Sequence, residues 1–229
     1  PERDRAAYDM GAYWARAGVA AALTLPGGDL PYQRGGMGDH LTGMALAGGV
    51  AAAIYARDRT GEGQLVATSL LRAGMYQMGT DLNANVRAGT ETVASSVRRV
   101  ANPLLTGYRC ADDKWVWLLC LEGDRHWPNV ARALELEELG DDERFTTMEG
   151  RRDHAEHVWT TLQERFLGRT RDEWAPLLDG AGVWWAKVQQ THELVADEQA
   201  AAAGGFVEVP MPYGTTARMV ATLVDFAGR

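Results

Sequence analysis

The sequence predicts a mixed α+β fold in two parts, the second being a small module over about residues 106–203. Helical periodicity with many small side chains dominates the first 88 residues. Residues 89–103 lose that periodicity and gain Ser, Thr and Arg, as a linker does. From Tyr108 onward, strand patterns alternate with helical ones, which is typical of an α+β module.

The first part is expected to be mainly helical. A helix over 9–22 is interrupted by Gly11 and Gly18, and two loops follow it. The helix predicted over 40–57 has small side chains nearly all round, so neighbouring backbones can approach it closely and we expect it to be buried. A short strand over 64–70 and a long helix to about Ala88 complete this part.

The second part begins with a predicted β-hairpin. Its strands are residues 108–110 and 115–121, joined by the polar turn 111–114. Thr170 is a predicted N-cap for the helix over 171–180. We expect the tryptophans of this part to form its core. The remaining predicted elements are helices over 124–138 and 151–167, a strand over 183–188, a helix opening at Thr191, and strands over 205–210 and 219–224.

Composition and charge exclude several classes of protein. The chain has 46% hydrophobic and 24% charged residues, as a folded globular protein does. Its formal charge of -8 argues against general affinity for nucleic acid or an anionic membrane. The apolar run 41–56 is too short and too rich in Gly and Ala to cross a bilayer. Cys110 and Cys120 match no metal or disulfide pattern, so we expect structural thiols in a reducing cytoplasm.

The stretch GMGDHLTG, residues 36–43, places Asp39 where a helix is about to begin. Unpaired N–H groups and the helix dipole favour an ionised carboxylate at such a position. From this pattern alone, Asp39 is either a capping residue or a reactive carboxylate.

The surrounding segments resemble those of the class III CoA-transferases, the CaiB/BaiF family. The segment GDHLTGMALAGGVAAAIYARDRTGEGQLVATSL is similar to the family's Gly-Asp pair, small-residue helix and Thr-Gly-x-Gly-Gln turn. YDMGAYWARAG resembles a segment about thirty residues upstream, and NPLLTGYRCADDKWVWLLCLEGDRHWPNV resembles the hairpin of the small domain. The resemblance spans nearly the whole chain.

The resemblance implies that Asp39 is a covalent nucleophile that moves CoA between carboxylic acids. The nearby glycines, Gly38 among them, then allow close approach of the thioester. Tyr8 and Asp9 match an aromatic-acidic pair near the nucleophile. The related acyl-CoA racemases carry a histidine at the position of Tyr8, so the transferase is favoured over the alternative, a racemase or isomerase. His40 is a weaker candidate for the missing base.

The resemblance also implies ligands and domain limits. Coenzyme A enters as the acyl-CoA substrate, no metal is expected, and Tyr8, Asp9 and Gly38 are predicted to contact it. From the sequence itself, Arg98 and Arg99 are predicted to contact the phosphates of CoA or a substrate carboxylate, and the alternative is a solvated basic pair. We expect part of a Rossmann-like large domain over 1–88, a linker over 89–105, a small domain over 106–203 and a segment returning to the large domain over 204–229. The chain resembles a family member truncated at both ends. By the same resemblance, we expect the whole protein to be an interlocked homodimer. A third alternative is a non-catalytic fragment or assembly subunit.

Overall fold

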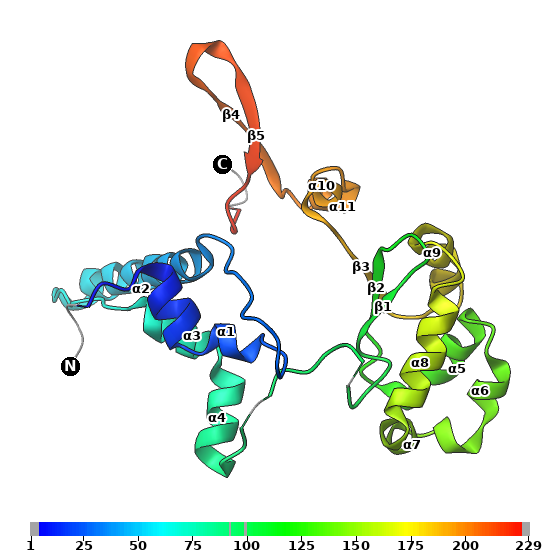
Figure 1. Ribbon diagram of the computed structural model, residues 1–229. Helices are drawn as coiled ribbons and strands as arrows, with labels where there is room; N and C mark the ends of the chain where they lie inside the picture. The colour runs from blue at the N-terminus through cyan, green and yellow to red at the C-terminus, as the bar shows by residue number, and fades with distance from the viewer. Residues whose placement is uncertain (1–4, 92, 99, 226–229) are drawn as a thin grey trace. The chain divides into compact units, whose positions relative to one another are not determined.

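The computed structural model describes residues 5–91, 93–98 and 100–225. They group into two compact units that divide between Ser96 and Val97 (Figure 1). Helices and small sheets together make this the mixed α/β fold that the sequence predicts. No helix in the described ranges has both the length and the apolar character needed to cross a bilayer.

The first unit is helical wherever it has regular structure. Its short core consists of Tyr13, Trp14, Val19 and Ala20, and helices η1 and α3 pack against each other beside it. Gly18, at a φ of 88°, separates η1 from α1, so this glycine interrupts the helix as predicted whereas Gly11 does not. The elements are the π-helix η1 (Met10–Arg16) and the α-helices α1 (Val19–Ala22), α2 (Met37–Thr60), α3 (Leu70–Gln77) and α4 (Gly79–Ala88).

The strand predicted over 64–70 is wrong. Residues 62–69 are irregular, and α3 begins at Leu70 after an N-cap at Ser69, whose hydroxyl accepts a hydrogen bond from the Arg72 amide. A strand needs hydrogen bonds from a neighbour. None of the described segments pairs with this one, and Leu65 is 92% exposed.

The predicted burial of the helix over 40–57 is also wrong for this chain. Helix α2 extends beyond the predicted bounds at both ends, and Gly38 is its only buried residue. Among the described elements, α3 makes the main contact with α2, so larger side chains such as Ile54 and Tyr55 stay exposed. Small side chains allow another helix to pack closely, but they lead to burial only where such a neighbouring element is present.

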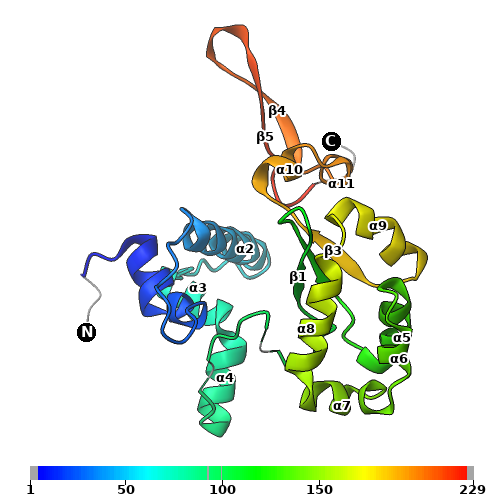
Figure 2. The ribbon, with the colours of Figure 1, turned by 45° about the vertical axis from the view of Figure 1, so that its right-hand side comes forward.

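The second unit is built around a three-stranded antiparallel sheet of order β1–β2–β3, and α8 lies alongside β1 (Figures 1 and 2). The predicted hairpin is confirmed, with Tyr108 opposite Val116. The sheet strands are β1 (Gly107–Arg109), β2 (Trp115–Leu118) and β3 (Trp185–Val188). The other elements are α5 (Gly123–Ala133), α6 (Glu137–Asp141), η2 (Glu143–Phe145), α7 (Met148–Asp153), α8 (Ala155–Phe166), α9 (Arg171–Gly180), α10 (Thr191–Val195) and α11 (Glu198–Ala202).

Three predicted long helices are each two shorter ones. The helix expected to run to Ala88 breaks at Met78, between α3 and α4. The helix predicted over 124–138 breaks before α6, where Glu135 has a φ of 55°, outside the helical range. The helix predicted over 151–167 breaks at His154, between α7 and α8. Apolar periodicity continues across such breaks, so it does not reveal them.

A second, separate hairpin consists of β4 (Phe206–Pro210) and β5 (Thr216–Val220), joined through η3 (Pro212–Gly214). The strand over 205–210 is confirmed, whereas the one predicted over 219–224 starts earlier and ends at Val220. Register explains the shift, because Pro210 pairs with Thr216 across the short loop. A hairpin loop of fixed length sets which residues face one another.

Aromatic residues fill much of the core of the second unit. Trp127, Trp159 and Trp174 are buried as expected, but Trp184 is 54% exposed and Trp117 is 39% exposed. The two cysteines are buried and free. Burial, with the nearby Asp112 charge, raises the pKa of the Cys110 thiol to about 12, which keeps it protonated and unreactive.

A charge pair between buried Arg171 and partly buried Glu193 ties α9 to α10. The guanidinium of Arg171 donates to both carboxylate oxygens of Glu193, at 3.3 Å and 2.6 Å, and to the backbone oxygen of Val188 at 2.9 Å. The Lys114 ammonium lies 3.2 Å from Oε1 of Glu193. The backbone N–H of Gln190 donates to Oε2 of Glu193 at 3.0 Å. Hydrogen bonds from Arg171, Gln190 and Lys114 lower the pKa of Glu193 to about 2 from a usual value of 4.5.

Glu193→Gln is therefore expected to destabilise the second unit at neutral pH. The depressed pKa of Glu193 gives stability that is fully present above pH 4.5 and is lost as the pH falls towards about 2. The difference in thermal stability between wild type and Glu193→Gln should accordingly shrink over that interval. Tryptophan fluorescence reports it, since Trp14 is the chain's one tryptophan outside this unit. Glu164→Gln, an exposed change on α8, is the control, and an equal effect of both variants would contradict the assignment.

Candidate active site

Asp39 stands in the first turn of α2, three residues after the N-cap Gly36. Gly36 has a φ of 80°, a left-handed conformation that glycine adopts without strain and that turns the chain into the helix. The side chain of Asp39 is exposed. At the start of a helix, the unpaired N–H groups and the positive end of the dipole stabilise its negative charge.

A second carboxylate caps the same helix from outside it. The buried side chain of Asp9, 29 residues earlier in the chain, accepts the Gly38 amide at 3.1 Å and 3.3 Å through its two oxygens. Asp9 lies immediately before η1. The bond therefore fixes the start of α2, with Asp39 on it, to the segment that carries Tyr8 and Asp9.

Gly38 is needed because its neighbours occupy the space of a side chain. A Cβ atom on Gly38 would lie 2.2 Å from Oδ1 of Asp9 and 2.4 Å from Cγ of Tyr13. Burial, together with the Asp9 charge, raises the pKa of Tyr13, so its phenol stays protonated. The N–H of Gly38 already donates to Asp9, so an oxyanion at Asp39 would have to accept hydrogen bonds from other N–H groups of this turn.

A cavity of about 430 Å³ brings several of the predicted residues together. Tyr8, Asp9, Gly36 and Asp39 line it, and Leu70 of α3 contributes to its wall. Its volume lies at the lower end of the range usual for small-molecule sites. Tyr8 and Asp9 therefore lie near Asp39, as the family resemblance implies, and their contact with CoA stays a prediction.

Tyr8 has a strained backbone at this cavity. Its φ is 49°, in the left-handed region that residues other than glycine seldom adopt, and its side chain is 86% exposed. Such conformations occur often at binding and catalytic sites. The turn at Tyr8 lets the phenol stand outward while the next side chain, Asp9, points into the protein.

Two residues of this region were missed by sequence reasoning or given little weight. Gln33 also lines the cavity and is 3% exposed, although its neighbours Tyr32 and Arg34 are exposed. No motif marks it; the only signal is its place in the loop before Gly36. His40 is exposed, and its imidazole packs over Gly36, with Cε1 3.0 Å from where a Cβ on that glycine would lie.

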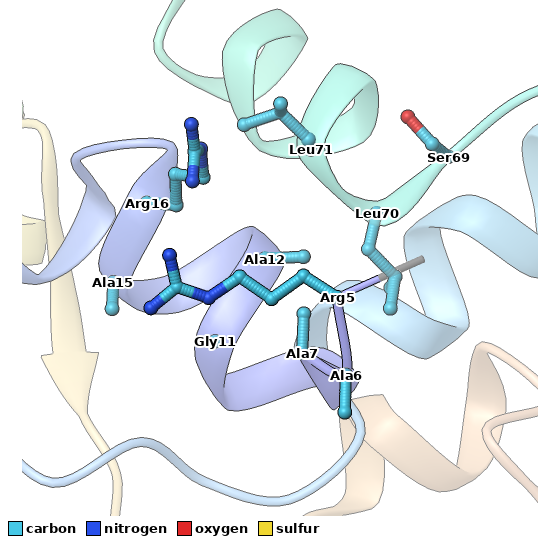
Figure 3. A pocket seen from close by; sticks show the side chains of 10 residues that line it. All are labelled: Arg5, Ala6, Ala7, Gly11, Ala12, Ala15, Arg16, Ser69, Leu70 and Leu71. Carbon is cyan, nitrogen blue, oxygen red and sulfur yellow. The ribbon is translucent and has the colours of Figure 1, made fainter. Parts of the chain in front are cut away.

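A larger cavity of about 920 Å³ lies in the same unit (Figure 3). Leu70 lines this cavity as well as the one at Asp39. Figure 3 shows the long side chain of Arg5 lying along η1, with the guanidinium of Arg16 on the same helix, against alanine side chains. Two guanidinium groups beside an apolar wall suit an anionic ligand that has an apolar segment. Neither arginine was predicted from the sequence to be a site residue.

Arg98, which was predicted to contact CoA, is not in this unit. Arg98 belongs to the second unit, where its guanidinium lies 5.5 Å from the ring of Trp159. Arg99 lies outside the described residues. Among residues 5–91, 93–98 and 100–225, no three His, Cys, Asp or Glu side chains are grouped so as to hold a metal ion.

The Asp9 cap makes a separate prediction. Asp9→Ala removes the acceptor of the Gly38 amide and is expected to destabilise the start of α2 by about 1 kcal/mol, the usual cost of a lost N-cap. Hydrogen exchange of the peptide over 36–43 should then be faster. Asp29→Ala, an exposed change in the loop before α2, is the control. Unchanged exchange in Asp9→Ala would show that the bond contributes nothing.

The chain is similar to several known proteins. The model of CoA-transferase family III matches residues 1–229. The chain is 31% identical over 226 residues to (R)-2-hydroxy-4-methylpentanoate CoA-transferase of Clostridioides difficile, covering 99% of this chain and 56% of the relative. It is also 31% identical over 228 residues to cinnamoyl-CoA:phenyllactate CoA-transferase of Clostridium sporogenes, covering 99% and 55%. The chain thus spans about half the length of these relatives.

The fold has a match among solved structures as well. The crystal structure of a CaiB/BaiF family protein from Brucella suis superposes with a TM-score of 0.83 at 22% identity. The match covers 100% of this chain and 58% of that one. At this identity the similarity establishes the fold and nothing more.

Proposed function

Because the chain belongs to CoA-transferase family III, we propose that Asp39 is the covalent nucleophile of an enzyme that moves CoA between carboxylic acids. One observation carries the proposal: Asp39 is an exposed carboxylate that lines a cavity at the start of a helix. A carboxylate in that place is open to a substrate and can act as a nucleophile.

The proposed reaction exchanges one acid for another in four acyl transfers. The Asp39 carboxylate attacks the thioester carbonyl, forming a mixed anhydride and releasing CoA thiolate. The thiolate attacks the aspartyl carbonyl of the anhydride, which gives an aspartyl-CoA thioester and the free first acid. The carboxylate of the acceptor acid attacks this thioester, giving a second anhydride and thiolate. The thiolate then attacks the acceptor's acyl carbon, which yields the new acyl-CoA and restores Asp39.

We propose 2-hydroxy carboxylic acids as one substrate class. The relatives in Clostridioides difficile and Clostridium sporogenes are named for 2-hydroxy-4-methylpentanoate and phenyllactate, which both carry a hydroxyl next to the carboxyl group. The cavity at Asp39 has room for an acid of that size.

For the phosphates of CoA we propose two sets of cations. Arg98 and Arg99 are the sequence-based candidates, and Arg5 and Arg16 are candidates because they line the cavity next to that of Asp39. Guanidinium groups bind phosphate oxygens through paired hydrogen bonds.

We further propose a homodimer in the cytoplasm, where CoA esters are metabolised. The long exposed surface of α2 supports this proposal, because it leaves apolar side chains for a partner to cover.

Trapping tests the proposal. The complete gene product is incubated with an acyl-CoA and hydroxylamine, which converts an activated aspartyl group to a hydroxamate. Peptide mass mapping is expected to find the modification on Asp39. Exchange of the α-proton with solvent deuterium, with no trapped aspartate and no exchange of acids, would contradict it and indicate a racemase or isomerase. If neither trapping nor proton exchange occurs, the result indicates a non-catalytic subunit.

A further inference from the structure

We infer that Gln33 recognises the 2-hydroxyl and the acyl oxygen of the substrate held at Asp39. The inference rests on the proposed function and assigns a binding residue to it. Gln33 lines the cavity of Asp39, and its side chain is 3% exposed.

The amide of Gln33 has no partner within the described part of the chain. Neither Oε1 nor Nε2 makes a hydrogen bond, and both atoms are buried. Folded proteins pair more than nine in ten of their buried polar groups. A buried polar group without a partner destabilises the folded protein. A buried and unpaired amide in a residue that lines a cavity is accounted for if a ligand that enters the cavity supplies its partners.

The local chain directs Gln33 inward. Tyr32 is 85% exposed and Arg34 is exposed, so the side chains on either side of Gln33 point to solvent. An extended segment sends successive side chains to opposite sides. The same loop leads through Gly36 into α2, which fixes Gln33 relative to Asp39 along the chain.

The chemistry of the amide matches a 2-hydroxyacyl group. Nε2 carries two donors, and Oε1 is an acceptor. A 2-hydroxyacyl group presents an acceptor, the acyl oxygen, and a donor, the hydroxyl, on adjacent carbons. One carboxamide can therefore pair with both at once. Gln33 is also uncharged, so it adds no cation that would neutralise the nucleophile.

This pairing predicts discrimination against acids without the hydroxyl. A deoxy substrate leaves Oε1 of Gln33 buried and unpaired, and sites built to bind a hydroxyl reject analogues that lack it. For one such bond we expect a preference of about 10-fold to 100-fold in kcat/KM.

The test uses the complete enzyme with two esters, 2-hydroxy-4-methylpentanoyl-CoA and 4-methylpentanoyl-CoA. Gln33→Met keeps the side-chain length and removes the amide. Both esters lose the bond to the acyl oxygen, but only the hydroxy ester also loses the bond to its hydroxyl, so kcat/KM is expected to fall about 10-fold to 100-fold more for the hydroxy ester than for the deoxy ester. Gln33→Glu keeps an acceptor for the hydroxyl, so it should retain a preference for the hydroxy ester. Its charge should raise KM for the free acid. Gln64→Met, the same change at an exposed position, is the control.

Several results would overturn the assignment. They are an equal loss on both esters in Gln33→Met, no loss on either, or a wild type without preference for the hydroxy ester. If circular dichroism shows that Gln33→Met does not fold, Gln33→Glu decides, and loss of its hydroxy preference would refute the role. Trapping of Asp39 in the wild type keeps the two proposals apart. If the wild type gives the Asp39 adduct but Gln33→Met leaves the ratio of kcat/KM for the two esters unchanged, only the role of Gln33 is refuted. If neither ester gives an adduct in the wild type, both proposals are refuted.

Discussion

Asp39→Asn in the complete enzyme is expected to lower kcat for CoA transfer by about 10³-fold or more. Asparagine has nearly the shape of aspartate, and the side chain is exposed, so the fold should be unaffected. The amide is too weak a nucleophile to open a thioester. The loss should therefore appear in kcat with both donor and acceptor saturating.

The measurement is exchange of CoA between an acyl-CoA and a labelled acid, read by mass spectrometry. Asp58→Asn is the matched control, because it makes the same change on the last turn of the same helix, where Asp58 contacts Arg57 at 2.9 Å. It should transfer CoA at the wild-type rate. Substantial activity in Asp39→Asn would assign the covalent step to another residue.

Gly38→Ala is expected to destabilise the first unit by about 3 kcal/mol or more, the upper end of the range for overpacking. The new methyl group would lie 2.2 Å from Oδ1 of Asp9 and within 2.6 Å of two carbon atoms of Tyr13. Neither neighbour can withdraw easily, since Asp9 is bonded to the Gly38 amide and Tyr13 belongs to the small core.

Thermal unfolding followed by far-ultraviolet circular dichroism measures this loss. Gly43→Ala and Gly48→Ala are the controls, because a Cβ at either position meets nothing within 4 Å and both lie inside α2. Alanine is favoured over glycine in a helix by about 1 kcal/mol, so these variants should be as stable as wild type or more stable. Equal effects at all three glycines would refute the packing argument.

Much of the active-site region was predictable from the sequence because its signals are local. A glycine pair, an aspartate and a run of small residues predict a helix N-terminus with a carboxylate on it, and the structure has that arrangement at Asp39. The nearness of Tyr8 and Asp9 came from the family resemblance. Neither local pattern nor periodicity indicates the bond between Asp9 and Gly38, because it joins residues 29 positions apart.

The errors arose where structure depends on distant partners. The strand over 64–70 has a strand-like composition but no strand beside it among the described residues. The exposed surface of α2 has the composition of a buried one. Gln33 was missed for a related reason: its buried amide has no hydrogen-bond partner among the described residues, and a sequence pattern does not show that.

Leu70 lines two cavities of the first unit, the one at Asp39 and the larger one beside it. A change at Leu70 therefore bears on both the cavity of Asp39 and the cavity lined by Arg5 and Arg16. Replacing Leu70 with a smaller apolar residue should enlarge both cavities while leaving every charged group unchanged. Steric and electrostatic contributions to substrate choice can thus be varied independently in this protein.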